Sequence, residues 1–186
     1  MKLMIASDLH GSAHYTRLLL EAYKKEQADK LILLGDILYH GPRNPLPEEY
    51  APAKVAEMLN AMKQEILCVR GNCDSDVDQM VLEFPIVAEN CLIYTDCGTT
   101  IFATHGHVFN EGSLPMLARG DILLHGHTHV PVCRKHENYT YVNPGSVSLP
   151  KENSAHGYMT VEDGELLWKT LDGEIYDRHA LSELTA

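Results

Sequence analysis

The sequence predicts an α/β fold in which a largely parallel sheet, formed by the first half of the chain, packs against a second sheet. Up to residue 70, short apolar runs alternate with segments of helical spacing, an order typical of parallel sheets. Beyond residue 85 the pattern changes to short β-type segments separated by turn signals. No linker or internal repeat divides the chain, so we expect a single domain over residues 1–186.

The first half supplies the strands and helices of the parallel sheet. Three apolar runs are predicted as buried strands, at 2–7, 30–34 and 65–70. Between them, residues 13–26 and 53–64 have apolar residues at helical spacing, and Ser12 is a suitable N-cap for the first helix. Residues 39–52 are rich in proline and polar groups, which indicates a loop.

The second half is predicted to form the second sheet. Its β-type segments lie at 86–88, 91–95, 99–104, 121–125, 131–134, 139–142, 156–162 and 166–171. Asn143-Pro144-Gly145 and Asp163-Gly164 are the clearest turn signals between them. We expect one helix in this half, at about 112–119.

Composition and charge exclude several classes of protein. The net charge is −11 and no basic cluster is longer than two residues, as at Lys24-Lys25, which disfavours stable nucleic-acid binding. No stretch approaches the length of a membrane span, and the N-terminal apolar run is too short for a signal peptide. The five cysteines form no CxxC pair, so we expect reduced thiols and a cytoplasmic protein.

Polar residues follow each predicted strand of the first half. They are Asp8 and His10 after the first strand, Asp36 after the second, and Asn72, Cys73 and Asp74 after the third. Because the carboxyl ends of parallel strands form one rim, these side chains are expected to converge.

Two histidine-rich turns follow strands of the second half. His105-Gly106-His107 comes after 99–104, and His125-Gly126-His127-Thr128-His129 comes after 121–125. The glycines permit sharp turns, so the imidazoles can face the same rim.

Carboxylates and imidazoles in this arrangement predict a site for two divalent cations. Such ligands suit ions such as Mn²⁺, Fe²⁺ and Zn²⁺, and Asp36 is a candidate to bridge both ions. The two aspartates, Asp8 and Asp36, carry −2 in total, so two divalent cations leave the site positive. That surplus attracts a phosphate and lowers the pKa of a bound water.

The motifs DxH, GD, GNCD, THGH and GHTH occur in this order between residues 8 and 129. This order resembles the calcineurin-like metallophosphoesterase superfamily, and the short chain with its Asn143-Pro144-Gly145-Ser146 stretch resembles the small bacterial YfcE-type phosphodiesterases. The resemblance covers about two-thirds of the chain. It implies a four-layer αββα sandwich of two packed mixed sheets flanked by helices.

The resemblance also implies the ligands and the reaction. One metal is expected on Asp8, His10, Asp36 and His129, and the other on Asp36, Asn72, His105 and His127. Asp36, Asn72, Cys73 and His105 are the residues expected to act on the reacting phosphate. The implied reaction is in-line attack on a small phosphodiester by a hydroxide that bridges the metals. The two ions are expected to be Mn²⁺, with Fe²⁺, Ni²⁺ and Zn²⁺ as alternatives.

Cys73 departs from the family pattern, in which many relatives have a histidine thought to protonate the leaving oxygen. A thiol is a weak hydrogen-bond donor and a poor cation. We therefore expect a preference for good leaving groups and for diesters over monoesters. A small buried residue without a role in catalysis is the equally weighted alternative for Cys73.

Other functions and other roles stay open at this stage. A phosphomonoesterase of the same fold is one alternative, and an interaction scaffold like the retromer subunit that shares this fold is another. His107 is expected beside the metal ligands or the substrate and His125 in a structural role, while Arg43 in the 39–52 loop could meet a phosphate. A homo-oligomer, dimer or tetramer, is compatible with the sequence.

Overall fold

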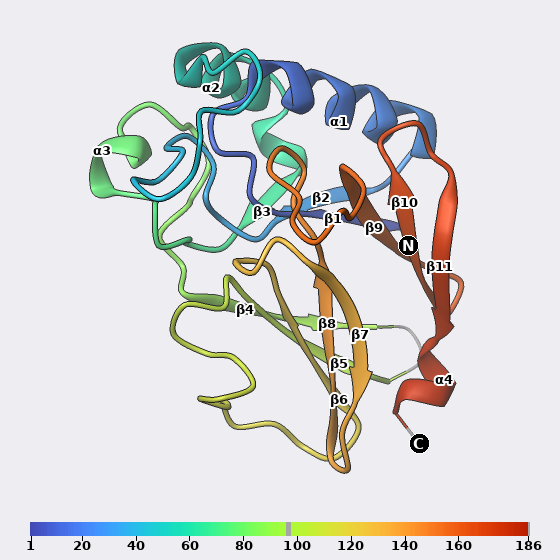
Figure 1. Ribbon diagram of the computed structural model, residues 1–186. Helices are drawn as coiled ribbons and strands as arrows, with labels where there is room; N and C mark the ends of the chain where they lie inside the picture. The colour runs from blue at the N-terminus through green and yellow to red at the C-terminus, as the bar shows by residue number, and fades with distance from the viewer. Residues whose placement is uncertain (96–97, 186) are drawn as a thin grey trace.

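The computed structural model describes residues 1–95 and 98–185 and consists of two packed β-sheets with helices over the outer face of the first sheet (Figure 1). The first sheet contains six strands, in the order β11 (Ile175–Ala180), β10 (Glu165–Thr170), β9 (Gly157–Glu162), β1 (Leu3–Ala6), β2 (Lys30–Leu33) and β3 (Ile66–Cys68). The second contains five, in the order β4 (Asn90–Tyr94), β5 (Thr100–Thr104), β6 (Asp121–His125), β8 (Tyr139–Pro144) and β7 (Pro131–Lys135).

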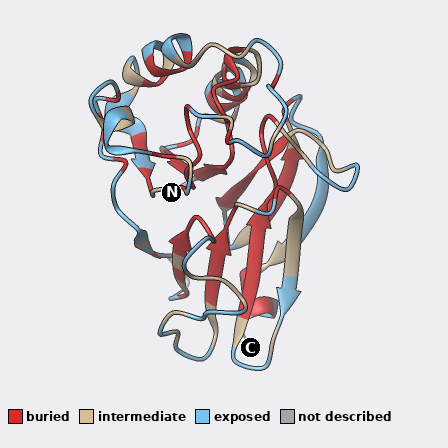
Figure 2. Ribbon diagram, turned by 60° about the vertical axis from the view of Figure 1, so that its left-hand side comes forward, coloured by how far each residue is buried: buried red, intermediate tan, exposed pale blue. Residues whose placement is uncertain are grey.

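The alternation of side chains along β1 explains how the layers are held together. Met4 and Ala6 point to a core shared with the helices, whereas Leu3 and Ile5 point to a core shared with the second sheet. All four residues are buried, as are the central strands of both sheets (Figure 2). A strand buried on both faces has a continuous apolar sequence, which is the pattern that predicts β1 and β2, whereas Leu67 on the edge strand β3 is exposed.

The two longer helices cover the outer face of the first sheet. In α1 (Ala13–Glu26), the hydroxyl of Ser12 accepts a hydrogen bond from the backbone N–H of Tyr15, so the predicted N-cap is confirmed. α2 (Pro52–Asn60) begins with a proline in its first turn, where no backbone donor is needed. A short 3₁₀ turn, η1 (Lys63–Glu65), continues the predicted 53–64 segment into β3.

Both sheets are mixed, which confirms the predicted α/β sandwich of two packed mixed sheets. β1, β2 and β3 run parallel, and β9, β10 and β11 extend this sheet in antiparallel pairs. β5, β6 and β8 run parallel, with β4 and β7 antiparallel at the edges.

The assignment of 156–162 and 166–171 to the second sheet is wrong. β9 pairs with the free side of β1, Leu3 opposite Val161, and β10 follows through a two-residue turn. Asp163 and Gly164 have φ values of 49° and 78°, so the predicted hairpin turn is confirmed. Side-chain pattern alone does not say which free strand edge a hairpin joins. β11 was not predicted, because its mostly exposed residues lack an apolar run.

The helix predicted at 112–119 does not form. Pro115 within this segment disfavours helical backbone at Leu114 and removes a donor. The irregular segment 106–120 instead covers the outer face of the second sheet. There the ring of Phe109 meets that of Phe102 on β5 at 5.6 Å, and Glu111 pairs with Arg134 on β7 at 2.8 Å.

Three smaller differences concern short elements. Residues 86–88 form no strand, and the backbone N–H of Ile86 donates to Gln79 instead. α3 (Asp76–Gln79) was not predicted, although Ser75 and Asp78 form a capping box that its sequence spacing indicates. α4 (Leu181–Leu184) closes the described chain and packs Leu181 and Leu184 into the core between the sheets.

Two further facts bear on the predictions from composition. None of the helices within the described residues has the length and apolar character that crossing a bilayer requires. Cys68, Cys73, Cys91 and Cys133 are free thiols, whereas Cys97 lies outside the described residues.

Candidate metal centre

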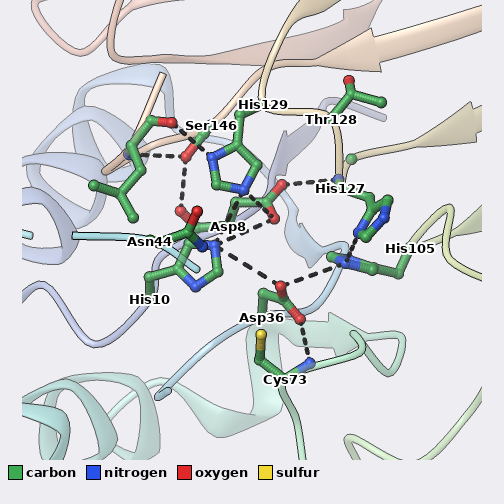
Figure 3. A network of polar contacts seen from close by, with 12 residues as sticks. Asp8, His10, Asp36, Asn44, Cys73, His105, His127, Thr128, His129 and Ser146 are labelled. Atoms are coloured by element: carbon green, nitrogen blue, oxygen red, sulfur yellow. Dashed lines mark hydrogen bonds and ion pairs between the residues drawn. The ribbon is translucent and has the colours of Figure 1, made fainter. Parts of the chain in front are cut away.

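The polar residues that follow five different strands lie together in one cluster (Figure 3). Their side chains point toward a common centre from loops that are far apart in the sequence. All seven expected ligands belong to this cluster, namely Asp8, His10, Asp36, Asn72, His105, His127 and His129.

The backbone is left-handed at five of these seven residues. The φ values are 59° at Asp8, 49° at His10, 55° at Asp36, 67° at His127 and 64° at His129. Such residues cost about 1–3 kcal/mol each outside glycine and persist where their surroundings hold them. The same left-handed bends thus recur at both pairs of ligands, 8 with 10 and 127 with 129.

Two glycines permit the close approach of these loops. A Cβ at Gly71 would lie 2.1 Å from Oδ1 of Asp36, and a Cβ at Gly126 would lie 1.9 Å from Oγ of Ser7 and 2.7 Å from Oδ2 of Asp8. No side chain larger than hydrogen fits either position without displacing a carboxylate of the centre.

Asp74 holds the loop that carries Asp36. Its carboxylate accepts hydrogen bonds from the backbone N–H groups of Asp36 at 2.9 Å, Ile37 at 2.8 Å and Gly71 at 2.7 Å. Burial, the largest influence, raises the pKa of Asp74 although these backbone donors oppose the rise. In the sequence Asp74 stands out only as part of a motif, because the partners of its carboxylate come from two separate loops.

The first half of the centre contains two imidazoles whose Nε2 atoms face each other at 3.2 Å. The Nδ1 atom of His10 lies 2.9 Å from the carbonyl of Tyr39, and that of His129 lies 2.6 Å from the carbonyl of Leu149. A carbonyl only accepts, so both Nδ1 atoms are donors and both Nε2 atoms of the neutral rings present lone pairs. Oδ1 of Asp8 lies 3.6 Å from Nε2 of His10 and 3.3 Å from Nε2 of His129.

The second half repeats this arrangement around His105. Its Nδ1 donates to the carbonyl of Leu34 at 2.7 Å, so the Nε2 of the neutral ring again presents a lone pair. That nitrogen faces Oδ1 of Asn72 at 3.0 Å, Nδ1 of His127 at 3.1 Å and Oδ2 of Asp36 at 3.5 Å. Nε2 of His105, Oδ1 of Asn72 and Oδ2 of Asp36 are thus three acceptors gathered around one point.

Asp36 lies between the two halves. Its Oδ2 is 3.8 Å from Nε2 of His10 and 3.5 Å from Nε2 of His105. Its other oxygen accepts a hydrogen bond from the backbone N–H of Cys73 at 2.8 Å. One carboxylate oxygen is therefore directed at both groups of ligands.

The protonation of the centre follows from burial and from the carboxylates. Burial, helped by His105, lowers the pKa of His127 to about 4, so this imidazole is neutral at pH 7. Burial acts to raise the pKa of Asp8, but the adjacent imidazoles of His10 and His129 hold it well below the usual value. Burial is the largest single influence on the pKa of His10 and lowers it, but Asp8, the carbonyl of Tyr39 and Asp36 together raise this pKa above the usual value. A field that favours a proton on His10 favours a divalent cation more strongly.

These observations fit bound metal. Oδ1 of Asp8 is buried and has no hydrogen-bond partner, the Nε2 lone pairs of His10 and His129 face each other, and that of His105 faces oxygens of Asn72 and Asp36. Buried acceptors without donors are destabilising unless a cation coordinates them. Three acceptor atoms of Asp8, His10 and His129 lie within 4.8 Å of one another, as do those of Asp8, Asp36 and His105.

A cavity of about 520 Å³ opens onto this centre. Asp36, Cys73 and His129 line its inner wall, and the cations of Arg43 and Lys151 line its outer part. The sequence indicates Arg43 as a candidate phosphate contact but not Lys151, which no motif contains. The backbone N–H of Lys151 donates to the carbonyl of His129 at 3.1 Å and so places this lysine beside the centre.

The remaining histidines near the motifs lie outside the cluster of ligands. His125 is buried and stacks on Tyr141 at 4.4 Å. His107 is exposed, with its ring 5.4 Å from that of His105, at the edge of the centre. His40 packs its ring against Tyr39 and Tyr50.

Fold and site together define a metal-dependent phosphoesterase. Residues 1–164 match the family model of the calcineurin-like phosphoesterase superfamily domain, and the chain belongs to this superfamily. It is 48% identical over 166 residues to phosphodiesterase YfcE of Escherichia coli K12, which covers 89% of this chain and 90% of that protein. The superfamily binds divalent metal, so the prediction of a metal-binding enzyme is confirmed at that level.

Solved structures agree with this placement. The structure of YfcE, a phosphoesterase from E. coli, superposes with a TM-score of 0.93 at 46% identity, covering 97% of this chain and all of that one. Wild-type Vps29 of Entamoeba histolytica, complexed with Zn²⁺, has the same fold, with a TM-score of 0.61 at 20% identity over 97% of this chain and 99% of that one. The predicted metallophosphoesterase fold is thereby confirmed.

Proposed function

We propose that the protein is a phosphodiesterase that uses two divalent cations, one held by Asp8, His10, Asp36 and His129 and the other by Asp36, Asn72, His105 and His127. The observation that supports this most directly is the position of Asp36. One of its oxygens is directed at both halves of a cluster of otherwise unpaired acceptors. Phosphodiester hydrolysis is also the activity in the name of YfcE, at 48% identity.

Bound divalent ions would supply a water of lowered pKa and would neutralise charge on the reacting phosphate. The residues of the chain hold and orient the reactants. Nδ1–H of each of the three imidazoles donates to a backbone carbonyl and so fixes the ring with its Nε2 toward the centre, in His10, His105 and His129. The guanidinium of Arg43 and the ammonium of Lys151 line the approach and attract the anionic substrate.

Cys73 favours a diester over a monoester in this site. Burial first, and Asp36 second, raise the pKa of its thiol, so the side chain is neutral. A neutral, weakly donating group at the reacting phosphate compensates less negative charge than an imidazolium would. A diester carries a single negative charge, so it needs less compensation by positive groups than a monoester does.

We propose Mn²⁺ as the metal, with Fe²⁺, Ni²⁺ or Zn²⁺ able to replace it, because each accepts mixed imidazole and oxygen ligands. The net charge of −11 disfavours a polynucleotide, so the substrate is a small phosphodiester. We further propose that the protein is cytoplasmic, forms a single domain over residues 1–186 and assembles as a dimer or tetramer.

The test uses protein stripped of metal and reloaded with each ion in turn. We expect Mn²⁺ to restore hydrolysis of bis(4-nitrophenyl) phosphate well above that of 4-nitrophenyl phosphate, with two ions bound per chain. Asp36→Asn should take up at most one ion and lose about 10²–10³-fold in kcat/KM. His136→Ala, which removes an imidazole paired with Glu111 on the second sheet, is the matched control.

Three results would contradict the proposal in different ways. Saturation at one ion per chain excludes the two-metal site. Faster cleavage of the monoester identifies a phosphomonoesterase instead. Loaded protein that hydrolyses neither ester supports the alternative of an interaction scaffold with the same fold.

A further inference from the structure

A second cavity, of about 710 Å³, lies beside the metal centre between α2 and α3. We call it the apolar cleft and define it by Tyr50, Ala53, Ala56, Val77, Val81 and Cys73. Its volume is within the range of small-molecule sites. No residue of the proposed metal centre other than Cys73 lines it.

Cys73 connects the apolar cleft with the metal centre. Its side chain lines both cavities, while its backbone N–H donates to Oδ1 of Asp36 at 2.8 Å. Its sulfur lies within 4.8 Å of ligand atoms of His10 and Asp36. A molecule whose phosphorus lies at Asp36 can therefore extend past the thiol into the cleft.

The rim of the cleft exposes apolar surface to water. Val77 is 68% exposed, Val81 51% and Tyr39 42%. The backbone of Tyr39 is anchored to the centre, because its carbonyl accepts the hydrogen bond from His10. Covering such side chains with an apolar group removes their surface from water and stabilises the complex.

The charges of the two cavities are opposite. Arg43 and Lys151 line the cavity at the metal centre, whereas the charged residues among the described lining of the apolar cleft are Glu57 and Asp78. Asp78 is fixed there by hydrogen bonds from Ser75. A second phosphate or another anionic group is therefore disfavoured in the cleft.

We propose that the apolar cleft binds one ester substituent of the substrate, and that this substituent is a large, uncharged, apolar or aromatic group. The inference rests on the proposed phosphodiesterase function and narrows its substrate class. The substrate is a monoanionic diester with its phosphate at the metal centre and its apolar group beyond Cys73. Polyphosphorylated substituents are excluded.

The test compares two monoanionic esters that differ only in the substituent, methyl methylphosphonate and 4-phenylbutyl methylphosphonate. Their dissociation constants are measured by calorimetry on Mn²⁺-loaded protein. We expect the phenylbutyl ester to bind at least about tenfold more tightly. Ala53→Trp, which fills the cleft from an exposed position of α2, should reduce this preference to near one.

Lys54→Trp adds the same ring at the next position of α2, outside the lining of the cleft, and should keep the wild-type preference. Val77→Asp is a second variant, which adds a carboxylate at the rim and should weaken only the phenylbutyl ester. Equal binding of both esters by the wild type, or an unchanged preference in both cleft variants, overturns the proposal.

Hydrolysis and oligomeric state separate the remaining explanations. The methyl and phenylbutyl 4-nitrophenyl phosphates are assayed in parallel. Turnover without a preference for the phenylbutyl ester leaves the phosphodiesterase and overturns the cleft proposal. A preference in binding without turnover supports the cleft and contradicts the phosphodiesterase. A dimer that dissociates in Ala53→Trp, with no ester preference, identifies the cleft as an interface between two copies of this chain.

Discussion

Two polar clusters of this protein are built on opposite principles. At the metal centre, acceptors face acceptors, as with Nε2 of His10 and His129 at 3.2 Å. At the opposite end of β1, Lys169 donates to Glu26 at 2.9 Å and to Glu162 at 3.2 Å, and Lys2 pairs with both glutamates. The second cluster satisfies its own charges, whereas the first is complete only with a ligand.

The comparison teaches how a ligand site differs from a structural ion network. Glu26 also accepts a hydrogen bond from Tyr158, so the network alternates donors and acceptors. Such a network stabilises the fold without a partner. The metal centre combines unpaired acceptors with left-handed backbone at Asp8 and Asp36, so part of its stability depends on what it binds.

The largest effect is expected when the centre is displaced without removing any ligand. In Gly71→Ala the new Cβ overlaps Oδ1 of Asp36, so the carboxylate must move by an ångström or more. Because such a displacement costs roughly 10²-fold in rate, kcat/KM for bis(4-nitrophenyl) phosphate should fall by that factor or more. Gly112→Ala, with 3.3 Å to its nearest neighbour, is the control; equal activity in both variants would contradict this geometry.

A smaller loss is expected when the support of Asp36 is weakened. Asp74→Asn offers one acceptor in place of two to the backbone N–H groups of Asp36, Ile37 and Gly71. Metal affinity, measured by calorimetry on stripped protein, should fall about 10–100-fold. Asp76→Asn changes an exposed carboxylate two residues away and should have no effect. Unchanged affinity in Asp74→Asn would show that Asp74 does not position the ligand.

Removing a charge from the second cluster should affect stability and leave catalysis unchanged. Glu26→Gln weakens hydrogen bonds from Lys2 and Lys169 and should cost about 2–4 kcal/mol in the free energy of unfolding. Denaturant unfolding measures this loss, and kcat/KM of the folded variant should equal that of the wild type. A fall in kcat/KM with unchanged stability would contradict the assignment of this cluster to stability and not to catalysis.

The pH dependence of this loss has a definite sign. Burial acts to raise the pKa of Glu26, but hydrogen bonds from Lys2 and Lys169 lower it below the ordinary value of 4.5. The contribution of Glu26 is therefore fully present above pH 4.5 and is lost as the pH falls through the lower pKa of the folded protein. The difference in stability between wild type and Glu26→Gln should shrink in that acid window and stay constant near neutrality.

The smallest effect is expected at Cys73. Cys73→Ala removes a neutral, weak donor, so diester hydrolysis should change only a few-fold. Cys73→His introduces a stronger donor and should raise the rate on 4-nitrophenyl phosphate relative to the diester. If neither variant changes the rate or the ratio of diester to monoester hydrolysis, Cys73 has no part in selectivity.

The first half of the fold was predictable because its strands β1 and β2 are buried on both faces. Continuous apolar runs at β1 and β2 and helical spacing in α1 have few other interpretations. In the second half, by contrast, the sequence pattern did not predict the strand pairings that depend on packing between distant segments. The hairpin of β9 and β10 joins the edge of β1, and the exposed strand β11 is stabilised by its pairing with β10.

The order of the motifs was enough to select the candidate ligands, because each follows a strand whose carboxyl end lies at one rim. It did not identify Asp74 as the residue that holds the Asp36 loop, nor Lys151 as a cation of the approach. These roles depend on contacts between loops that are far apart in the chain. The apolar cleft between α2 and α3 was likewise invisible, since its lining comes from several elements.

The sequence by itself therefore determined the strands buried on both faces, the family and the set of residues available to hold cations. The local sequence encodes these properties, because the apolar run of a buried strand and the residues of a turn each span only a few positions. Only the tertiary structure decided which lone pairs face each other, which sheet takes the β9–β10 hairpin and where an apolar substituent finds room. Those outcomes depend on distances between segments that sequence separation does not specify.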